Sequence, residues 1–442
     1  MAAESPSFGA LLRRHRLAAG LTQEGLAERA GISARAVSDL ERDGARVPYQ
    51  STVALLLAAL ELPPAPAAEL RAAAHPGARA DDHPAPPLDT LPAPTTPLLG
   101  RDEAVAAVAA LLYADGARLV TLTGPGGVGK TRLGVAVARH LAPAYPDGAW
   151  LVALAPLADP ALVPAAIAGA LRVPERGGEP LAATLRARLR RQRLLLVLDN
   201  CEHLLPGVGL AGDLLAACPG LAVLATSRSP LGLAGEHEYP VPPLALPGPS
   251  ERLPLEALRR YPAVALFLAR ARAVAPDVVA TDADLPAVAA ICARLDGLPL
   301  AIELAAARAR LLPPAALLAR LEPRLALLTG GPRDAPARQR TLRRTLDWSH
   351  ALLAVPERVL FARLAVFARG ATLDAIAAVC AGDADSLDLL DGLDALVRAS
   401  LLHRAEEGGG EPRFAMLETI REYAAERLDE SAQAEAVRRA HA

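Results

Sequence analysis

A glycine-rich stretch between an apolar run and a helical pattern constrains this chain more than any other feature. It consists of Gly124, Pro125, Gly126, Gly127, Val128, Gly129, Lys130 and Thr131, and it matches GxxxxGK[ST] at every specified position. The apolar run at 118–123 predicts a buried strand, and residues 131–141 predict a helix. This context predicts a loop whose backbone N–H groups surround a phosphate at the N-terminus of a helix.

Lys130 is the single lysine of the chain, although lysine and arginine together number 47. A compact ammonium on a thin stem fits where a planar guanidinium does not. We therefore predict that Lys130 bridges the β- and γ-phosphates of ATP, ADP or a close relative, and that the Thr131 hydroxyl is a ligand of Mg²⁺. The alternatives, a ligand-free glycine turn and chance survival of one lysine, explain less of the pattern.

A second apolar run, residues 194–198, ends in Asp199. P-loop folds use an acid at the end of such a strand to hold Mg²⁺ from the second side, so we predict that Asp199 is a metal-site and catalytic residue. Nearby Glu202 is a candidate for polarising an attacking water or, equally, a surface carboxylate. Residues 221–225 predict another strand, and Arg228 beyond its tip is either a sensor of the γ-phosphate or a surface arginine.

The order of these patterns predicts a multidomain fold. Buried strands that alternate with helices indicate an α/β P-loop NTPase with a parallel sheet. The flanking patterns are helical, and the last one adds two short strands typical of a winged helix. We expect an all-α helix-turn-helix domain at 7–75, a Pro-rich linker at 76–97, the NTPase at 98–250, a helical subdomain at 251–335 and a winged-helix domain at 336–428.

Residues 429–442 predict the start of a C-terminal helix that ends with the chain at residue 442. A truncated product, a fragment and a regulator whose sensor lies elsewhere are all compatible with this ending.

From residue 97 to 428 the chain resembles STAND-class NTPases of the NB-ARC type. The P-loop, the Asp199 strand, the Thr226-Ser227-Arg228 turn and Gly297-Leu298-Pro299-Leu300 occur in that family's order, after an entry motif Leu99-Gly100-Arg101-Asp102-Glu103. The resemblance implies that Arg101 lies near the adenine and ribose, that Pro299 packs on adenine and that Arg228 is the sensor arginine. It also implies a slow ATPase used as a switch.

One position departs from that family. Where many members carry Met-His-Asp in the winged-helix domain, with the histidine on the ADP phosphate, this chain has Met416-Leu417-Glu418. Leu417 cannot make that contact. The stretch resembles the Met-Leu-Glu-Thr variant of bacterial regulator-type members.

The N-terminal segment predicts a run of short helices in the helix-turn-helix pattern. Ala27 falls where helices cross closely, Gly31 at the turn, and Val37 and Leu40 toward the core. Residues 7–62 resemble the Cro-like (XRE) family of DNA-binding domains, in which Arg16 and Glu41 would pair inside the domain.

In that geometry the third helix lies in the major groove. Ala34, Arg35 and Ser38 would face base edges, with Arg35 able to contact guanine bidentately, and Gln23 and Arg46 would contact phosphates. Acids and arginines are nearly balanced in this segment, so one copy should bind DNA weakly, and oligomers would raise the affinity.

Composition narrows the class of protein. Apolar residues make up 52%, charged residues 22%, and the net charge is −2, which is typical of a soluble globular chain and excludes a uniformly basic nucleic-acid coat. Apolar stretches are interrupted by prolines, no secretory signal is visible, and the four cysteines lack CxxC spacing. We therefore expect a cytoplasmic protein with reduced thiols and no membrane partner.

Together these features predict a transcriptional regulator in which ATP or ADP with Mg²⁺ controls homo-oligomerisation and operator binding. The alternative from another class is an NTPase effector in defence or signalling whose helical N-terminal domain binds protein rather than DNA.

Overall fold

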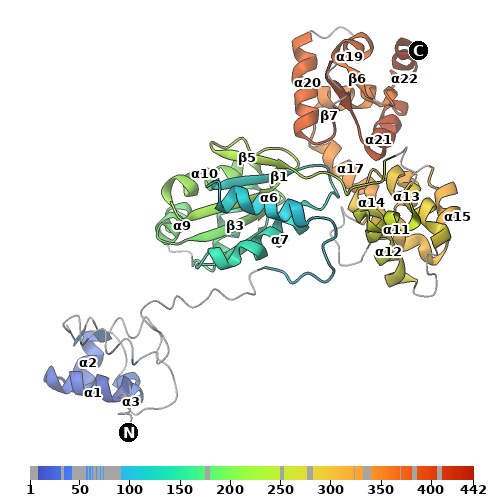
Figure 1. The fold of residues 1–442 in the computed structure, drawn as a ribbon. Coiled ribbons are helices and arrows are strands. Elements are labelled where there is room, and N and C mark those ends of the chain that lie inside the picture. The colour runs from blue at the N-terminus through green and yellow to red at the C-terminus, as the bar shows by residue number, and fades with distance from the viewer. Residues whose placement is uncertain are drawn as a thin grey trace. The chain divides into compact units, whose positions relative to one another are not determined.

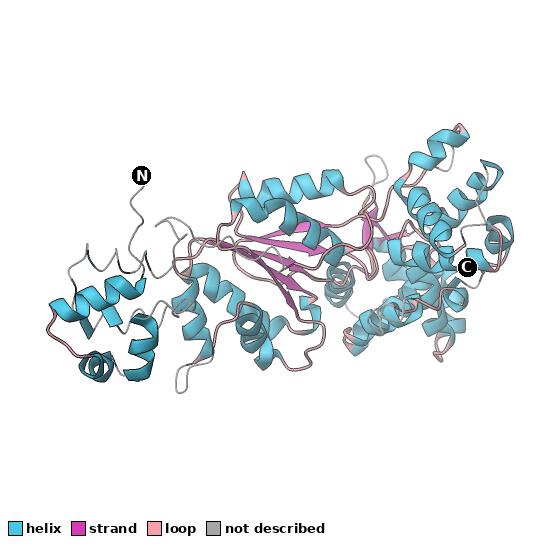
Figure 2. Ribbon diagram, turned by 90° about the horizontal axis from the view of Figure 1, so that it is seen from below, coloured by secondary structure: helices cyan, strands magenta, loops and turns pink. Residues whose placement is uncertain are grey.

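The structure is a computed structural model of the chain (Figures 1 and 2). It describes residues 8–30, 34–41, separate positions between 56 and 73, 91–174, 180–248, 253–275, 282–322, 324–331, 340–368, 370–380, 386–405 and 411–442. The chain divides into two compact units, Met1–Ala85 and Pro86–Ala442. Each unit has a hydrophobic core of its own. Across the described residues, the helices are too short or too polar to cross a lipid bilayer.

The first unit contains helices α1 (Phe8–Ala18), α2 (Gln23–Ala30) and α3 (Ala34–Glu41). The hydroxyl of Thr22 accepts a hydrogen bond from the Gly25 N–H at 3.0 Å, which caps α2 as its sequence predicts. The predicted core positions Ala27 and Val37 are buried, and Leu40 packs at the edge of the same core. Beyond residue 41, the predicted run of short helices falls largely outside the described residues.

A buried ion pair joins α1 to α3. Arg16 Nε lies 2.6 Å from Glu41 Oε1, and the two side chains are only 8% and 4% exposed. The same guanidinium donates to the Leu21 carbonyl at 2.8 Å, and Gln23 Nε2 donates to Glu41 Oε2 at 2.8 Å. The predicted internal pairing of Arg16 with Glu41 is confirmed, and Gln23 is part of the same cluster.

The second unit begins with a five-stranded parallel sheet in the order β2-β3-β4-β1-β5. Its strands are β1 (Leu119–Thr123), β2 (Ala149–Ala153), β3 (Leu194–Asp199), β4 (Leu221–Thr226) and β5 (Glu236–Pro240). The strands β1, β3 and β4 match the predicted apolar runs to within one residue at each end. β5 was not predicted, because this edge strand pairs through its backbone and has no apolar pattern.

Helices cover both faces of this sheet (Figure 2). Along β3, Leu195 and Val197 join the core on one face, while Leu194, Leu196 and Leu198 join the core on the other. A strand buried on both faces reads as a continuous apolar run, which is why β3 was visible in the sequence. The covering helices are α6 (Asp102–Tyr113), α7 (Lys130–Leu141), α8 (Val163–Ala170), α9 (Leu181–Leu189) and α10 (Leu205–Ala217), with 3-10 turns η2 (Ala142–Ala144), η3 (Pro160–Leu162) and η4 (Cys201–His203).

The next part of the unit is helical, as predicted (Figure 1). It contains α11 (Leu255–Arg260), α12 (Pro262–Val274), η5 (Asp282–Asp284), α13 (Leu285–Arg294), α14 (Pro299–Ala306), η6 (Ala307–Arg310), α15 (Pro314–Ala319) and α16 (Arg324–Leu327). Leucines and alanines of these helices form one core that continues into the face of the sheet covered by α7.

The C-terminal part combines helices with a small antiparallel sheet in the order β6-β8-β7. The strands β7 (His403–Ala405) and β8 (Arg413–Ala415) form the predicted hairpin, whose loop at 406–410 lies outside the described residues; the two-residue strand β6 (Ala371–Thr372) was not predicted. The helices are α17 (Leu342–Ala351), α18 (Val355–Arg363), η8 (Leu364–Val366), α19 (Leu373–Cys380), α20 (Ser386–Arg398), α21 (Glu418–Asp429) and α22 (Ala434–His441).

Candidate functional site

The glycine-rich loop connects β1 to α7, as the sequence predicts. Gly129 is the N-cap of α7 and has a left-handed φ of 98°, and Gly127 has a φ of 84°. A Cβ on Gly127 would also lie 2.8 Å from the Leu300 Cβ, and the Leu300 N–H donates to the Gly127 carbonyl at 3.2 Å. Both the backbone conformation and the close approach of α14 therefore require glycine in this loop.

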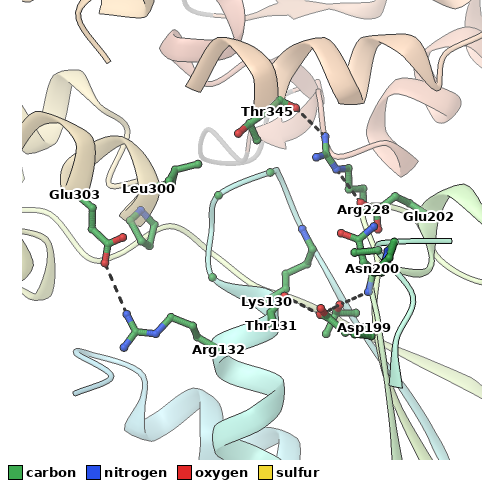
Figure 3. A pocket seen from close by; sticks show the side chains of 18 residues that line it. Lys130, Thr131, Arg132, Asp199, Asn200, Glu202, Arg228, Leu300, Glu303 and Thr345 are labelled. Carbon is green, nitrogen blue, oxygen red and sulfur yellow. Dashed lines mark hydrogen bonds and ion pairs between the residues drawn. The ribbon is translucent and has the colours of Figure 1, made fainter. Parts of the chain in front are cut away.

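The single lysine lies folded over its own loop (Figure 3). Its Nζ donates to the carbonyl of Gly124 at 2.6 Å and to that of Pro125 at 3.1 Å. Val128 faces the other way and is fully buried in the core. The loop thus holds an ammonium group beside backbone N–H groups at a helix N-terminus, an arrangement suited to an anion.

Asp199, at the end of β3, joins the loop to the sheet. Its Oδ1 accepts hydrogen bonds from the hydroxyls of Thr131 and Thr226, each at 2.7 Å, and its side chain is almost buried. The sheet register places Asp199 directly beside Thr226 of β4, and the Asn200 N–H donates to the Thr226 hydroxyl at 2.9 Å. The structure therefore brings together the two residues predicted to bind metal, Thr131 and Asp199.

Glu202 and Arg228 form a buried ion pair beside this carboxylate. Arg228 Nε lies 3.1 Å from Glu202 Oε1, and the side chains are 7% and 5% exposed. The other carboxylate oxygen of Glu202 is buried and has no hydrogen-bond partner among the described residues. Arg228 Nη1 also donates to the Thr345 carbonyl in α17 at 3.2 Å, and the Ser400 hydroxyl donates to the Arg228 carbonyl at 2.6 Å. Arg228 thus connects the sheet to the C-terminal helices.

These groups line one cavity of about 520 Å³ (Figure 3). Its walls come from the glycine-rich loop and the start of α7, the ends of β2, β3 and β4, the N-terminal part of α14 and one residue of α17. The predicted residues that line it are Gly126, Gly127, Gly129, Lys130, Thr131, Asp199, Glu202, Arg228 and Pro299. Gly124, Pro125 and Val128 shape the loop behind this wall.

Arg101 lies behind the loop rather than among the residues that line the cavity. It is buried, and its guanidinium donates to the Val128 carbonyl at 3.2 Å and to the Pro242 carbonyl at 2.8 Å. Burial lowers the pKa of Arg101. In this position it braces the loop against the segment that follows β5. Contact with adenine or ribose remains a prediction.

The cavity also contains residues that sequence reasoning missed. Thr345 reaches it from α17, and a Cβ on Gly126 would lie 2.5 Å from the Thr345 methyl. Arg132 and Glu303 also line the cavity, and Arg132 Nη1 lies 3.7 Å from Glu303 Oε1 (Figure 3). Arg132 directly follows the P-loop motif, and Glu303 lies one turn beyond Pro299, so closeness to a motif could have indicated both residues. No feature of the sequence near Thr345 indicates that it lines the cavity.

The DNA-reading candidates lie in the first unit. Ser38 is half-buried on α3, and Gln23 contacts Glu41. Ala34 and Arg35 belong to the first turn of α3, but their side chains lie outside what the structure describes, as does Arg46 altogether. Their contacts with DNA remain predictions.

The fold and site define a multidomain P-loop NTPase flanked by two helix-turn-helix modules. Sequence profiles match a helix-turn-helix domain at residues 7–70, an AAA domain at 114–238 and a winged helix-turn-helix domain at 353–429.

Two proteins of Mycobacterium tuberculosis are similar to the chain. "Uncharacterized protein Rv0894" is 40% identical over 348 residues, covering 77% of this chain and 84% of that protein. "Putative HTH-type transcriptional regulator Rv0890c" is 44% identical over 320 residues, covering 72% of this chain but only 34% of that protein. The chain belongs to the family of these mycobacterial proteins. It spans about one third of the length of the regulators that it matches.

Among solved structures, a STAND protein with a tetratricopeptide repeat sensor from Pyrococcus horikoshii aligns over 80% of this chain and 45% of its own, with 15% identity and a TM-score of 0.31. A score this low supports no conclusion about this chain.

Proposed function

We propose that this chain is a nucleotide-switched transcriptional regulator. Its cavity binds ATP or ADP with Mg²⁺, and its N-terminal helix-turn-helix unit binds operator DNA. The observation that carries the proposal is the hydrogen-bonded cluster of Thr131, Asp199 and Thr226, which lies with the Lys130 ammonium at the glycine-rich loop. A hydroxyl, a carboxylate and a lysine in this arrangement are the groups that hold a metal-bound polyphosphate.

The residues fit such a ligand chemically. Lys130 would exchange the carbonyls of Gly124 and Pro125 for the β- and γ-phosphates, which are stronger acceptors because they are charged. Thr131 and Asp199 offer the hard oxygen ligands that Mg²⁺ prefers. Bound Mg²⁺ would neutralise part of the phosphate charge. Pro299 and Leu300 offer apolar surface at the opposite wall of the cavity, where a purine base would lie.

Arg228 is suited to couple the nucleotide to the C-terminal helices. Its guanidinium contacts the Glu202 carboxylate and the Thr345 carbonyl, and a γ-phosphate would compete for the same N–H groups. Movement of Arg228 toward a phosphate would weaken the contact with α17 and release Glu202 to polarise water for slow hydrolysis. ADP would then favour a closed state and ATP an open, oligomer-competent state.

The experiment is to identify the nucleotide that copurifies with the protein, then compare ADP- and ATP-loaded protein by gel filtration and DNA binding. Trp348 in α17 provides a further signal, since its ring lies edge-on to His203 at 5.5 Å. The Trp150→Phe variant leaves Trp348 as the sole tryptophan. Identical elution, fluorescence and DNA affinity in the two states would rule out the switch.

Removal of Mg²⁺ and replacement of Asp199 should have overlapping effects. In wild type we expect chelation by EDTA and the Asp199→Asn substitution each to slow hydrolysis by about 100-fold, since a catalytic metal stabilises the transition state by several kcal/mol. In the variant, EDTA should have little further effect, because groups that act together are not additive. Asp213→Asn, an exposed acid on α10, is the matched control. Independent, multiplicative effects of EDTA and Asp199→Asn would contradict the metal role.

Arg35→Ala should weaken binding to a selected DNA site by roughly 5- to 150-fold, with little effect on random DNA, as expected for loss of a base contact worth about 1–3 kcal/mol. Arg46→Ala removes the same charge from a predicted phosphate contact, so it should weaken both DNAs alike and lower the salt dependence. Fluorescence anisotropy at several salt concentrations measures both. A silent Arg35→Ala variant would exclude α3 as the recognition helix.

A further inference from the structure

Helix α21 receives its N-terminal cap from a distant residue. The residue at its own N-cap position, Leu417, has no side-chain acceptor, so the first N–H groups of the helix need another partner. Asp296 supplies it: the Glu418 N–H donates to Oδ1 at 3.0 Å, and the N–H and hydroxyl of Thr419 both donate to Oδ2 at 2.8 Å. Thr419 is fully buried. A carboxylate there also complements the helix dipole.

Asp296 lies in a tight turn between α13 and α14. Its φ of 54° is left-handed, a region in which aspartate and asparagine are enriched among residues other than glycine. The following residue, Gly297, is also left-handed at 65°, and its carbonyl accepts from the Leu244 N–H at 2.9 Å. A Cβ on Gly297 would lie 2.4 Å from the Leu244 carbonyl oxygen. The turn is therefore fixed tightly against the segment that follows β5.

The other end of this turn reaches the glycine-rich loop. The Leu300 N–H donates to the Gly127 carbonyl, and the Leu300 Cβ occupies the space that a side chain at Gly127 would need. Five consecutive residues, 296–300, thus connect the cap of α21 to the wall of the cavity. This short, tightly packed segment places the loop contact at Leu300 and the cap at Asp296 four residues apart.

Other contacts hold α21 without touching the loop. Arg324 Nη1 lies 3.0 Å from Glu422 Oε2, and the Leu325 N–H donates to Glu422 Oε1 at 3.2 Å. These two bonds join Glu422 of α21 to α16, which is not among the elements that line the cavity. Arg324 itself also lies 3.7 Å from Glu418 and donates to the Arg294 carbonyl at 3.1 Å, so the bonds separate from the cap are those of Glu422.

We infer that Asp296 is a positioning residue for the phosphate loop, which links docking of α21 to the conformation of Gly127 and so to nucleotide affinity. The inference rests on the proposed nucleotide site. Coupling of this kind is reciprocal: if ADP strengthens the cap, the cap strengthens ADP binding by the same factor. Loss of the cap is therefore expected to lower the affinity for ADP by about tenfold. A factor of this size is usual when a helix cap with charged hydrogen bonds is removed.

The test compares Asp296→Asn with Glu422→Met in the full chain, since Glu422 accepts the bonds from α16. Asparagine tolerates the left-handed turn but presents an N–H₂ group to one of the donors of α21. Hydrogen exchange, followed by mass spectrometry without nucleotide, should show faster exchange both at residues 418–421 and at the loop, residues 124–132. Glu422→Met should accelerate exchange in α21 alone. ADP affinity by calorimetry should fall about tenfold in Asp296→Asn and stay within about twofold in Glu422→Met.

Thr419→Val removes only the hydroxyl that donates to Asp296, so it should produce smaller changes of the same kind. Thr419→Ser keeps the hydroxyl and should behave like wild type. These two variants keep the test valid if Asp296→Asn does not fold. Faster exchange in α21 with an unchanged loop and unchanged ADP affinity would show that Asp296 is only a cap and overturn the inference. Failure of the wild type to bind ADP would refute the nucleotide site alone, because the exchange comparison without nucleotide still tests the coupling.

Discussion

Lys130→Met is expected to weaken ATP and ADP binding by about 100-fold or more. Methionine keeps the length of the side chain but removes the one lysine ammonium of the chain, which lies against the loop carbonyls at the cavity. Truncating one partner of a desolvated charged contact costs about 2–5 kcal/mol, and about 1.4 kcal/mol corresponds to a factor of ten. Calorimetric titration with Mg²⁺-ADP measures the change directly.

The controls separate charge from shape and from folding. Lys130→Arg restores the charge on a planar group that the tight loop does not suit, so we expect partial recovery at most. Arg139→Met removes a cation from the same helix, where it contacts the Leu91 and Pro92 carbonyls away from the cavity, and should leave affinity unchanged.

The single lysine also permits a chemical readout. An amine-reactive acyl reagent can modify only Lys130 and the N-terminus, which peptide mapping distinguishes. ADP should protect Lys130 and leave the N-terminus reactive. Intact ADP affinity in Lys130→Met, together with absence of protection in wild type, would remove the basis for the nucleotide site.

Arg16→Met is expected to destabilise the helix-turn-helix unit by about 3–5 kcal/mol, enough to leave a small domain largely unfolded. The variant leaves the Glu41 carboxylate buried without its cation, since both side chains are almost inaccessible. Hydrogen exchange of peptides from residues 8–41 should become roughly 100-fold faster or more, while exchange in the second unit stays unchanged.

The double variant Arg16→Met/Glu41→Leu provides the sharper comparison. Replacing a buried ion pair by apolar side chains of similar size is often neutral, so the double variant should regain most of the stability. Arg14→Met on the exposed face of α1 should have little effect. If the double variant proved as unstable as Arg16→Met, the loss would come from packing rather than from the unpaired carboxylate.

The same pair gives the unit a pH dependence. Burial opposes ionisation of Glu41, but the hydrogen bonds from Arg16 and Gln23 outweigh it and lower the pKa of Glu41. A lowered folded-state pKa contributes stability that is present above the unfolded value, near pH 4.3, and is lost as pH falls through the folded value. The Glu41→Gln variant lacks this group. The free energy of unfolding of the first unit should therefore be lower than in wild type at neutral pH, and it should depend less on pH near pH 4.

The sequence by itself determined the parts of this protein whose signal is local. The glycine-rich loop is fixed by left-handed positions such as Gly129 and by its place between an apolar run and a helix. Asp199 followed from the doubly buried strand that precedes it, and the structure places it against Thr131. The Arg16–Glu41 pair joins residues distant in the chain; it was predicted from the resemblance to the Cro-like family, and the structure confirms it.

Only the tertiary structure decided which distant residues complete the site. Thr345 lies on a helix far from the loop in the chain, and no neighbouring motif marks it. Asp296 directly precedes Gly297-Leu298-Pro299-Leu300, but nothing in that motif indicates that its carboxylate caps α21. Strand β5 lacked an apolar pattern because it pairs at the sheet edge through backbone groups that every residue shares. Local patterns report the burial and backbone geometry of a segment. Contacts between segments depend on how the faces of helices and strands pack together, and no local pattern in the sequence shows this packing.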